Sequence, residues 1–414
     1  MASSNEYLAR SQESLASAST FNKVQLFGNG RTPFCLVRGD GAYTWDVDGN
    51  KYIDYIIGLG TMTLGHNHPV VNKAISEQLK KGISFSLPTP LEIQVAEMLI
   101  ERIPSAEKVK FGKNGNDATS AAVRLARYYT GRDHILFCGY HGWQDWYVCQ
   151  TSKNGGIPKC IGELSHRFVF NDINFLMKLL KDYKDNIACI ILEPIPAKEW
   201  PRDNFLEKVR EIATNNNVVL IFDEVVTGFR FHKGGAQALF NIVPDLSCFS
   251  KAIANGMPLS AIVGKAGIMS KFNDVYFSLT NAGETLSLAA AKAVLAFYDQ
   301  ADVPAQLARS GAKLREGIKS LIVKYNLSDR MEILGFDCRF GINFIDKNNL
   351  NYDPTDDLLY WIELVAAHGI LSAGWHMISY AHTDRVIEET LMIYGTVLPK
   401  MRAKLEGRME KKVG

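Results

Sequence analysis

Short apolar segments alternate with amphipathic ones through the middle of this sequence, and this alternation constrains the fold more than any other feature. The apolar segments are Lys108–Phe111, Ile135–Cys138, Ala188–Leu192, Val218–Phe222 and Ala261–Val263. The helical segments between or beside them are Leu91–Ile103, Asp117–Tyr129, Ile173–Lys181 and Phe205–Thr214. This rhythm predicts an α/β domain with a mainly parallel sheet and helices on both faces. Ligands of such sheets bind beyond the carboxyl ends of the strands.

The two flanks of this region predict a second, smaller domain. Residues 37–55 alternate apolar and polar side chains around Gly and Asp turns, as an antiparallel hairpin does. Met331–Ile345 is typical of strands, and helices are expected at about Asp356–His368 and Asp384–Glu406. Because 414 residues exceed what one core usually serves, we expect residues 1–65 and 301–414 to form a small α+β domain. Residues 66–300 would form the large domain, with the helical run Thr285–Tyr298 joining the two.

Charge and cysteine usage exclude several classes of protein. Lys+Arg (46) nearly cancel Asp+Glu (44), so the net charge of +2 gives no electrostatic reason to expect nucleic acid or a membrane surface as partner. The seven cysteines are scattered and never spaced C-x-x-C, which favours a reducing cytoplasm over a disulfide framework or a thiolate metal site. No secretory signal is apparent, and no apolar run approaches the roughly 20 residues that span a bilayer. We expect a soluble protein.

The strongest local signal is VVLIFDEVVTGFR, in which a buried strand ends in two carboxylates, Asp223 and Glu224. A carboxylate at this position is costly unless a cation or a strong donor meets it. Adjacent side chains of a strand point to opposite faces, so the two acids are not a catalytic pair. Taken alone, such a pair is more often a helix cap or a salt bridge than a catalytic feature.

A second strand end carries FGKNGNDATSAAVRLARYYTG, where Asn116 or Asp117 can cap a helix that stops at Gly131. The free N–H groups at a helix start suit a phosphate, because the macrodipole and the unpaired donors act together. The segment matches neither the P-loop nor G-x-G-x-x-G. An ordinary capped helix is the alternative.

A third strand end carries FCGYHGW, with Tyr140, His141 and Trp143 on a glycine-flanked turn. Aromatic rings there either stack on a flat ligand or belong to the core or a lid. A fourth signal is CFSKAIANGMP, which places Lys251 between an apolar segment and a Gly/Pro turn. A lysine that forms an imine needs such a partly desolvated position, although a lone lysine is more often a solvated charge.

Each of these signals is weak alone, but they follow successive strand ends of one domain. An anion site, an aromatic ring, a carboxylate and a lysine together describe a pocket for a phosphorylated pyridine aldehyde.

Ordered motifs run from about Trp45 to Thr383 and are similar to those of one enzyme family. They are WDVDGNKYIDY, GHNHP, NGNDATSAAVRLAR, YHGW, ILEP, FDEVVTGFR, SKAIANGMPLSAIVG, GETLSLAA and AHT. With these motifs the chain resembles the class III pyridoxal-phosphate-dependent aminotransferases, and within them the glutamate-1-semialdehyde 2,1-aminomutase branch. The resemblance implies fold type I, with a large domain built on a mainly parallel seven-stranded sheet and a smaller α+β domain.

The resemblance also implies roles for individual residues. Lys251 would form the Schiff base with pyridoxal 5'-phosphate and move a proton, while Asp223 would keep the pyridine nitrogen protonated. Tyr140 and Val225 would lie on the two faces of the ring, beside His141.

Phosphate contacts are implied on both sides of a subunit boundary. Gly115 and Asn116 would donate to the phosphate at the helix start. Thr280 corresponds to the threonine that reaches the phosphate of the neighbouring subunit, which implies a homodimer with a shared active site.

Two departures from the aminomutase branch bear on the reaction. The Ser-Pro-Val-Arg segment of that branch has no clear equivalent in FGNGRTPFCLVRGDG, where Arg31 is a possible substitute. The branch's C-terminal active-site glutamate is also missing from SAGWHMISYAHT. Both departures favour transfer of an amino group from an amino-acid donor, glutamate or another common one, to a separate small aldehyde or ketone. A sugar-derived acceptor is one such compound.

Substrate contacts are expected from Ser86, His141, Glu193 and His376, for each of which packing or orientation of neighbours is the alternative. Arg230 is expected in a structural or interface ion pair.

The sequence has features of three other functions. An aminomutase would move the amino group within one molecule. A hydrolytic metalloenzyme is suggested only by His66 and His68, which lack the spacing and the glutamate of H-E-x-x-H, so no metal is expected. A catalytically silent binding protein is disfavoured by the presence of both Lys251 and Asp223.

Overall fold

The protein is described by a computed structural model that covers residues 2–16, 32–349 and 351–412. It divides into two compact units, one formed by residues 69–304 and the other by residues 1–68 with 305–414. We call them the central unit and the terminal unit.

The central unit is built on a seven-stranded sheet with the order β4-β10-β9-β8-β7-β5-β6. The strands are β4 (Lys108–Gly112), β5 (His134–Cys138), β6 (Ser165–Arg167), β7 (Ile187–Leu192), β8 (Val219–Asp223), β9 (Leu246–Phe249) and β10 (Ser260–Gly264). Only β10 runs against its neighbours β4 and β9, so the mainly parallel sheet expected from the sequence is confirmed. Two strands were not expected, β6 and β9. In β9 a serine interrupts the apolar run, although all four of its residues are buried.

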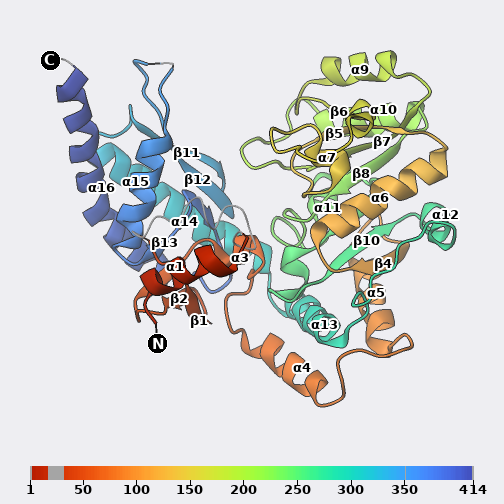
Figure 1. Cartoon of the computed structure of the whole chain (residues 1–414), viewed down its shortest axis with the longest axis horizontal. Coiled ribbons are helices and arrows are strands. Elements are labelled where there is room, and N and C mark those ends of the chain that lie inside the picture. The colour runs from red at the N-terminus through yellow and green to blue at the C-terminus, as the bar shows by residue number, and fades with distance from the viewer. Residues whose placement is uncertain (1, 17–31, 350, 413–414) are drawn as a thin grey trace. The chain divides into compact units, whose positions relative to one another are not determined.

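Helices cover both faces of this sheet (Figure 1). The helices of the central unit are α4 (Pro69–Leu79), α5 (Pro90–Arg102), α6 (Gly115–Thr130), α7 (Asp145–Val148), α8 (Lys159–Glu163), α9 (Ile173–Asp182), α10 (Phe205–Asn215), α11 (Ala236–Phe240), α12 (Ala266–Met269) and α13 (Thr285–Gln300), with 3-10 turns η1 (Lys251–Ala254) and η2 (Ser270–Asn273).

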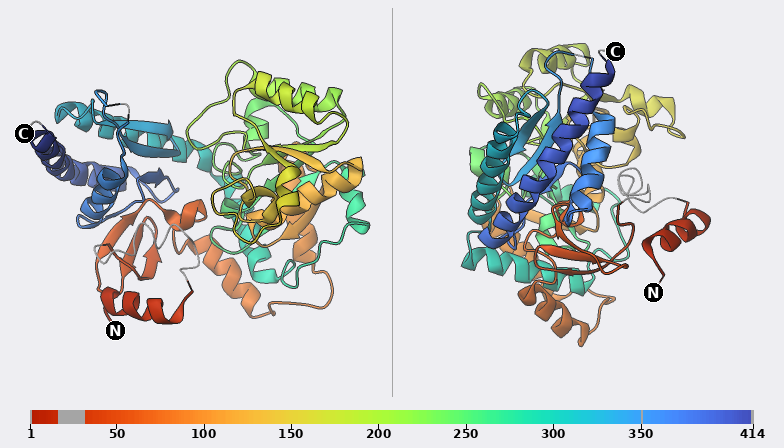
Figure 2. Two further views of the ribbon diagram at one scale, coloured as in Figure 1. Left: turned by 45° about the horizontal axis from the view of Figure 1, so that its top comes forward. Right: turned by 90° about the vertical axis from the view of Figure 1, so that its left-hand side faces the viewer.

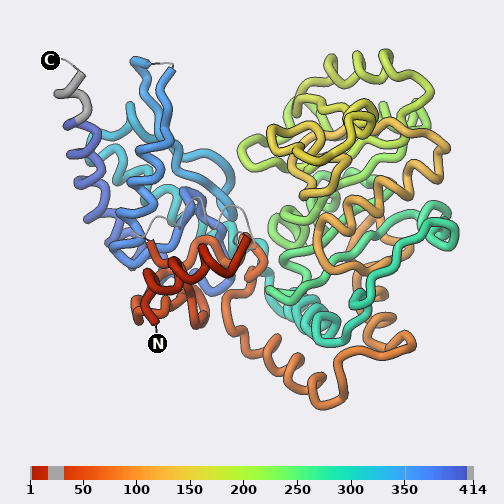
Figure 3. The backbone as a smooth tube through the Cα atoms, in the orientation of Figure 1, coloured from red at the N-terminus to blue at the C-terminus, as the bar shows by residue number. Residues whose placement is uncertain are grey.

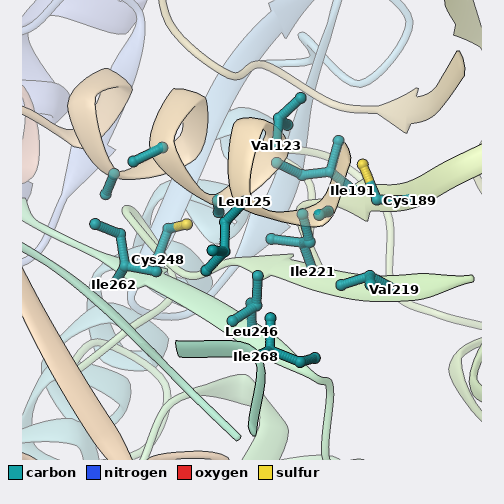
Figure 4. Packing of buried hydrophobic residues seen from close by; sticks show 14 of the residues in the cluster. Val123, Leu125, Cys189, Ile191, Val219, Ile221, Leu246, Cys248, Ile262 and Ile268 are labelled. Atoms are coloured by element: carbon teal, nitrogen blue, oxygen red, sulfur yellow. The ribbon is translucent and has the colours of Figure 1, made fainter. Parts of the chain in front are cut away.

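The two faces of the sheet have separate cores because side chains of a strand alternate. Ile135 and Phe137 of β5 pack under α6, whereas Leu136 and Cys138 pack with residues of α9 and α10. Figure 4 shows the first core, where Leu125 of α6 faces the strands. Both cores hold the sheet rigid, so the residues just beyond the strand ends start from fixed positions.

The terminal unit combines the two ends of the chain, as red and blue segments of Figure 3 show. Its strands are β1 (Leu36–Asp40), β2 (Tyr43–Asp46), β3 (Lys51–Asp54), β11 (Met331–Phe336), β12 (Arg339–Phe344), β13 (Ile370–Leu371) and β14 (Trp375–Met377). They form the sheets β1-β2-β3-β13 and β11-β12-β14. The parallel pairing of β13 with β3 joins the C-terminal part of the chain to the N-terminal hairpin.

The helices of the terminal unit are α1 (Ser4–Ser14), the short kinked α3 (Ile57–Gly60), α14 (Val303–Lys324), α15 (Thr355–Ala366) and α16 (Asp384–Lys412). Figure 2 shows α15 and α16 side by side. The helix at the boundary between the units is α14, which starts at residue 303. The expected connecting helix, α13, lies wholly in the central unit, where it packs against α4 and α5. None of the helices described in residues 2–16, 32–349 and 351–412 has the length and apolar character needed to cross a bilayer.

Candidate active site

Four segments singled out in the sequence follow strands of the central sheet, and close contacts bring them together. A Cβ atom on Gly115, at the start of α6, would lie 2.7 Å from Val225, just beyond β8. A Cβ atom on Gly142, in the turn after β5, would lie 2.5 Å from Asn116. Gly142 has a φ of 106°, which a glycine adopts without strain. The phosphate-type helix start, the aromatic turn and the end of β8 therefore share one edge of the sheet.

Asp223 and His141 form the buried polar centre of this edge. Asp223 is 3% exposed, and its Oδ2 lies 2.7 Å from Nδ1 of His141. Its Oδ1 accepts from the backbone N–H of Val225 at 3.0 Å. The other ring nitrogen of His141, Nε2, lies 3.1 Å from the carbonyl oxygen of Cys138. Both ring nitrogens of His141 are therefore within hydrogen-bond distance of an oxygen atom, which fixes the orientation of the ring.

Tyr140 leaves its ring in reach of solvent at the same place. Tyr140 is 62% exposed, while its backbone N–H donates to Oε2 of Glu193 at 3.0 Å. Partial burial, and then the negative charges of Asp223 and Glu193, raise the pKa of Tyr140 above its ordinary value, so the hydroxyl keeps its proton at neutral pH. We call Asp223, His141 and Tyr140 the strand-end cluster.

Two contacts fix the turn that carries the strand-end cluster. The carbonyl of His141 accepts from the hydroxyl of Thr119 in α6 at 3.1 Å. The ring of His141 stacks on Trp146, with ring centres 5.8 Å apart, and the indole N–H of Trp146 donates to Ser120 of α6. The turn is thus attached to the same helix whose start faces Val225.

The start of α6 differs in one respect from the expectation. The capping residue is Asn114, with extended dihedral angles, and neither Asn116 nor Asp117. Asp117 instead accepts from the backbone N–H of Asn114 at 2.7 Å, which closes a capping box. This places Gly115 and Asn116 in the first turn, where backbone N–H groups have no carbonyl partner within the helix.

Lys251 comes just after β9, the neighbour of β8. Cys248 of β9 pairs with Asp223 of β8, so the two strand ends lie side by side. Lys251 is half-buried and has a φ of 46°, in the left-handed region that a lysine rarely adopts. The hydroxyl of the preceding Ser250 donates to the carbonyl of Leu259 at 2.8 Å, which holds the Gly256–Pro258 turn against the end of β9.

The expected substrate residues occupy different surroundings. Ser86 and Thr280 are exposed loop residues of the central unit, and Glu193 is 8% exposed beside Tyr140. His376 lies in the terminal unit, is fully buried, and stacks on Phe340 with ring centres 4.8 Å apart. This burial favours the packing alternative for His376. Arg31 lies outside the described residues.

Two charged residues near this edge were not singled out in the sequence as functional. Lys113 and Glu284 form an ion pair, although they are 171 positions apart. Both stand inside motifs quoted above, yet no local pattern indicates that they meet. Arg230, 1% exposed, is buried within the central unit. Elsewhere, His66 lies 2.8 Å from Asp54, and the described residues contain no group of three or more His, Cys, Asp or Glu that could hold a metal ion.

Comparison with known proteins agrees with this geometry. The class III aminotransferase family model matches residues 26–390. The chain is 36% identical over 391 residues to glutamate-1-semialdehyde 2,1-aminomutase 2 of Lachnoclostridium phytofermentans, which covers 88% of this chain and 91% of that protein.

Solved structures resemble nearly the whole chain. The FumI protein of Sphingopyxis sp. MTA144, in its pyridoxal-phosphate internal aldimine form, matches with a TM-score of 0.89 and 25% identity over 97% of this chain and 96% of that one. An omega-transaminase from Sphaerobacter thermophilus matches with a TM-score of 0.85 and 25% identity over 96% and 98%. Fold type I and pyridoxal phosphate as cofactor, both implied by the motifs, are confirmed. The chain belongs to the class III pyridoxal-phosphate-dependent aminotransferases.

Proposed function

We propose that this enzyme transfers an amino group from an amino-acid donor, glutamate foremost, to a separate small aldehyde or ketone, with a sugar-derived carbonyl compound among the acceptors. The observation that carries the proposal is the strand-end cluster. It sets a buried carboxylate next to the end of β9, from which Lys251 follows.

The residues present fit the cofactor. Only glycine at position 115 lets the start of α6 approach Val225 so closely, because a Cβ atom there would lie 2.7 Å from the valine side chain. The backbone N–H groups of Gly115 and Asn116 lie in the first turn of α6 and have no partner within the helix. They therefore suit the phosphate group of the cofactor. Val225 and the exposed ring of Tyr140 suit the two faces of a flat ring, and Asp223 suits a protonated pyridine nitrogen.

Bound there, pyridoxal phosphate supplies an aldehyde that takes up the amino group and a ring that withdraws electrons from the substrate carbon. Asp223 would hold a proton on the ring nitrogen, and His141 would keep the carboxylate of Asp223 in place through its Nδ1 contact. The amine of Lys251, Nζ, would take a proton from one carbon and return it to another. The exposed ring of Tyr140 would cover one face and exclude water from it.

Intramolecular transfer is the second candidate, because the aminomutase of L. phytofermentans is 36% identical. Intermolecular transfer is favoured by the segment 372–383, SAGWHMISYAHT, which contains no acidic residue where the aminomutase branch has a glutamate. Ser86 and Glu193, together with His141, remain the proposed substrate contacts in the central unit. Arg31 is proposed for a substrate carboxylate.

We further infer a homodimer in which Thr280 reaches the phosphate of the neighbouring subunit. Thr280 is exposed in the single chain. The segment between α4 and α5 also exposes large apolar side chains, with Phe85 53% and Leu87 78% exposed, as an interface between subunits requires. All seven cysteines are free thiols, which supports a cytoplasmic location.

Reduction and a substrate screen test the proposal. Borohydride treatment of the cofactor-loaded protein is expected to fix the cofactor on Lys251, as peptide mapping would show. The protein is then loaded with pyridoxamine phosphate, and carbonyl compounds are screened for return of the pyridoxal absorption. A Lys251→Ala protein that transaminates at the wild-type rate would contradict the proposal. Sustained turnover of an amino aldehyde without any donor would instead establish intramolecular transfer.

A further inference from the structure

Lys113 and Glu284 form a nearly buried ion pair beside the proposed phosphate site. The distance between Nζ of Lys113 and Oε1 of Glu284 is 2.7 Å, and the side chains are only 13% and 11% exposed. Nζ of Lys113 also donates to the carbonyl oxygen of Pro258 at 3.0 Å. Such a pair is held in one geometry far more firmly than an exposed one.

The pair joins three segments that the proposed function uses. Lys113 directly precedes Asn114, the cap of α6, and so lies next to the first-turn donors. Pro258 ends the turn that follows Lys251. Glu284 caps α13, since it accepts from the backbone N–H of Leu286 at 2.8 Å and of Ser287 at 3.1 Å.

Glu284 also connects to the segment that carries Thr280. Its backbone N–H donates to the carbonyl of Asn281, the residue after Thr280, at 3.2 Å. The next residue, Thr285, donates its hydroxyl to the carbonyl of Gly82 at 2.9 Å, at the start of the loop that contains Ser86. The position of Glu284 therefore bears on two exposed loops with proposed roles.

Lys113 lies near the proposed phosphate site, but its ammonium group contacts other groups of the protein. Its ammonium group already meets a carboxylate and a carbonyl. Burial opposes the charge of Glu284, yet the hydrogen bonds from Lys113 and Ser287 outweigh it and lower the pKa of this carboxyl. Glu284 is therefore ionised at neutral pH, and the charge of Lys113 is neutralised inside the protein.

We propose that Lys113 and Glu284 are positioning residues whose ion pair fixes both the Thr280 segment and the start of α6 of one subunit. The start of α6 then donates to the phosphate of its own subunit, and Thr280 reaches the phosphate of the neighbouring subunit. This inference rests on the proposed cofactor roles of Gly115, Asn116 and Thr280. It assigns the two charged residues no direct contact with the cofactor.

The test compares Lys113→Met, Glu284→Gln and the double variant, with Lys110→Met as control. Lys110 is an exposed lysine of β4, the strand that ends just before Lys113, so this variant removes a lysine charge without breaking the ion pair. Glutamine keeps an oxygen that can cap α13. Dissociation constants are measured for pyridoxal phosphate and for pyridoxal, which lacks the phosphate.

Either single variant is expected to raise the dissociation constant of pyridoxal phosphate about tenfold and that of pyridoxal by less than about twofold, because only the phosphate contacts are displaced. The double variant is expected to bind pyridoxal phosphate no more weakly than the single variants, because the two residues act as a unit. A merely structural role would weaken both ligands alike and so contradict the inference. If Lys113 bound the phosphate directly, Glu284→Gln would tighten pyridoxal phosphate, which would also overturn it.

Hydrogen exchange of the cofactor-free protein separates this inference from the proposed function. Peptides covering residues 278–285 are expected to exchange about tenfold faster in both single variants, since the contact that orders them is lost. Unchanged exchange in these variants would overturn the inference while leaving the cofactor roles intact. If exchange is faster in the variants but borohydride does not fix the cofactor on Lys251 of the wild-type protein, the proposed function alone would be refuted.

Discussion

Two clusters of polar and aromatic side chains, one in each unit, differ in their exposure to solvent. The strand-end cluster of the central unit joins a buried carboxylate and imidazole to the exposed ring of Tyr140. The closed cluster of the terminal unit consists of His376, His382, Tyr55 and Tyr394, each less than 1% exposed. Histidines are therefore buried in both clusters, but only the strand-end cluster exposes an aromatic side chain to solvent.

The electrostatics of the two clusters differ as well. Within the closed cluster His376 shares a hydrogen bond with the Tyr394 hydroxyl, and Tyr55 stacks on His382 with ring centres 4.5 Å apart. Burial lowers the pKa of His376 to about 3 and that of His382 to about 4, so both rings are neutral at pH 7. His141 instead faces two acceptors and pairs with a carboxylate. In this molecule, His141 of the strand-end cluster contacts a carboxylate and follows an exposed tyrosine, whereas the two histidines of the closed cluster have buried aromatic neighbours.

Replacement of Asp223 breaks the strand-end cluster and has the largest expected effect. Asp223→Asn removes the charge that would stabilise the protonated pyridine nitrogen, so turnover is expected to fall about a thousandfold while the cofactor stays bound. Turnover and the absorption spectrum are measured on the same sample. An asparagine protein with turnover close to that of the wild type would mean that the carboxylate serves packing, as the closed cluster does.

Glu224, the neighbour of Asp223 in sequence, tests whether every buried acid of the central unit is functional. Its carboxylate, 0% exposed, accepts from the hydroxyl of Thr227 and from the backbone N–H groups of Ala236 and Gln237 at 2.8 and 2.9 Å. Glu224→Ala leaves three donors unpaired, so the free energy of unfolding is expected to fall by about 3 kcal/mol.

Denaturant unfolding measures the effect of this change, and Glu224→Gln, which keeps one acceptor, is the matched control. Turnover per folded molecule is expected to change much less than in Asp223→Asn. A large loss of turnover with unchanged stability would place Glu224 with the strand-end cluster instead.

The buried histidines of the closed cluster, His376 and His382, are expected to make the stability of the protein depend on pH. The unfolded chain protonates its histidines near their ordinary pKa of about 6.5, whereas the folded protein does so only near 3 to 4, so acid favours unfolding. Stability is present above pH 6.5 and is lost as the pH falls, by about 2 kcal/mol for each of the two histidines between pH 7 and pH 5.

Urea unfolding of His376→Gln at the two pH values isolates one of these contributions. Its loss of stability between pH 7 and pH 5 is expected to be about 2 kcal/mol smaller than that of the wild type. An equal loss would show that His376 does not titrate as a buried neutral ring. A raised KM with unchanged pH dependence would return His376 to the substrate contacts.

The backbone of Lys251 gives the smallest expected effect. At a φ of 46°, glycine avoids a strain that any side chain with a Cβ atom incurs. The free energy of unfolding of cofactor-free Lys251→Gly is therefore expected to be about 1 kcal/mol higher than that of Lys251→Ala. Thermal unfolding of the two variants checks this, and the comparison is matched because both lack the lysine side chain. Equal stabilities would mean that the conformation of residue 251 is unstrained.

Local pattern was sufficient to predict the parts of the molecule that depend on sequence neighbours. The apolar run 218–222 became β8, and the helix expected at Asp117–Tyr129 became α6. The cap of α6 was displaced to Asn114 because the capping box, rather than one preferred residue type, selects the helix start. β9 was missed because its serine breaks the apolar pattern.

Contacts between distant segments could not be predicted in the same way. The motifs identified Asp223 and His141 as neighbours of one cofactor, but their direct contact needs β5 and β8 to lie in one sheet. The pairing of Lys113 with Glu284 depends on where α13 begins in space, which no periodicity encodes. Sequence therefore indicated which residues gather at the site more fully than it indicated what each one touches.

The left-handed backbone of Lys251 has a consequence for how such an enzyme would change under selection. A library screened for heat resistance alone would favour glycine at position 251, because glycine removes the strain. A screen in which cell growth also depends on the product of the enzyme would keep lysine. The residue identity recovered at this one position would therefore report which of the two pressures the library had experienced.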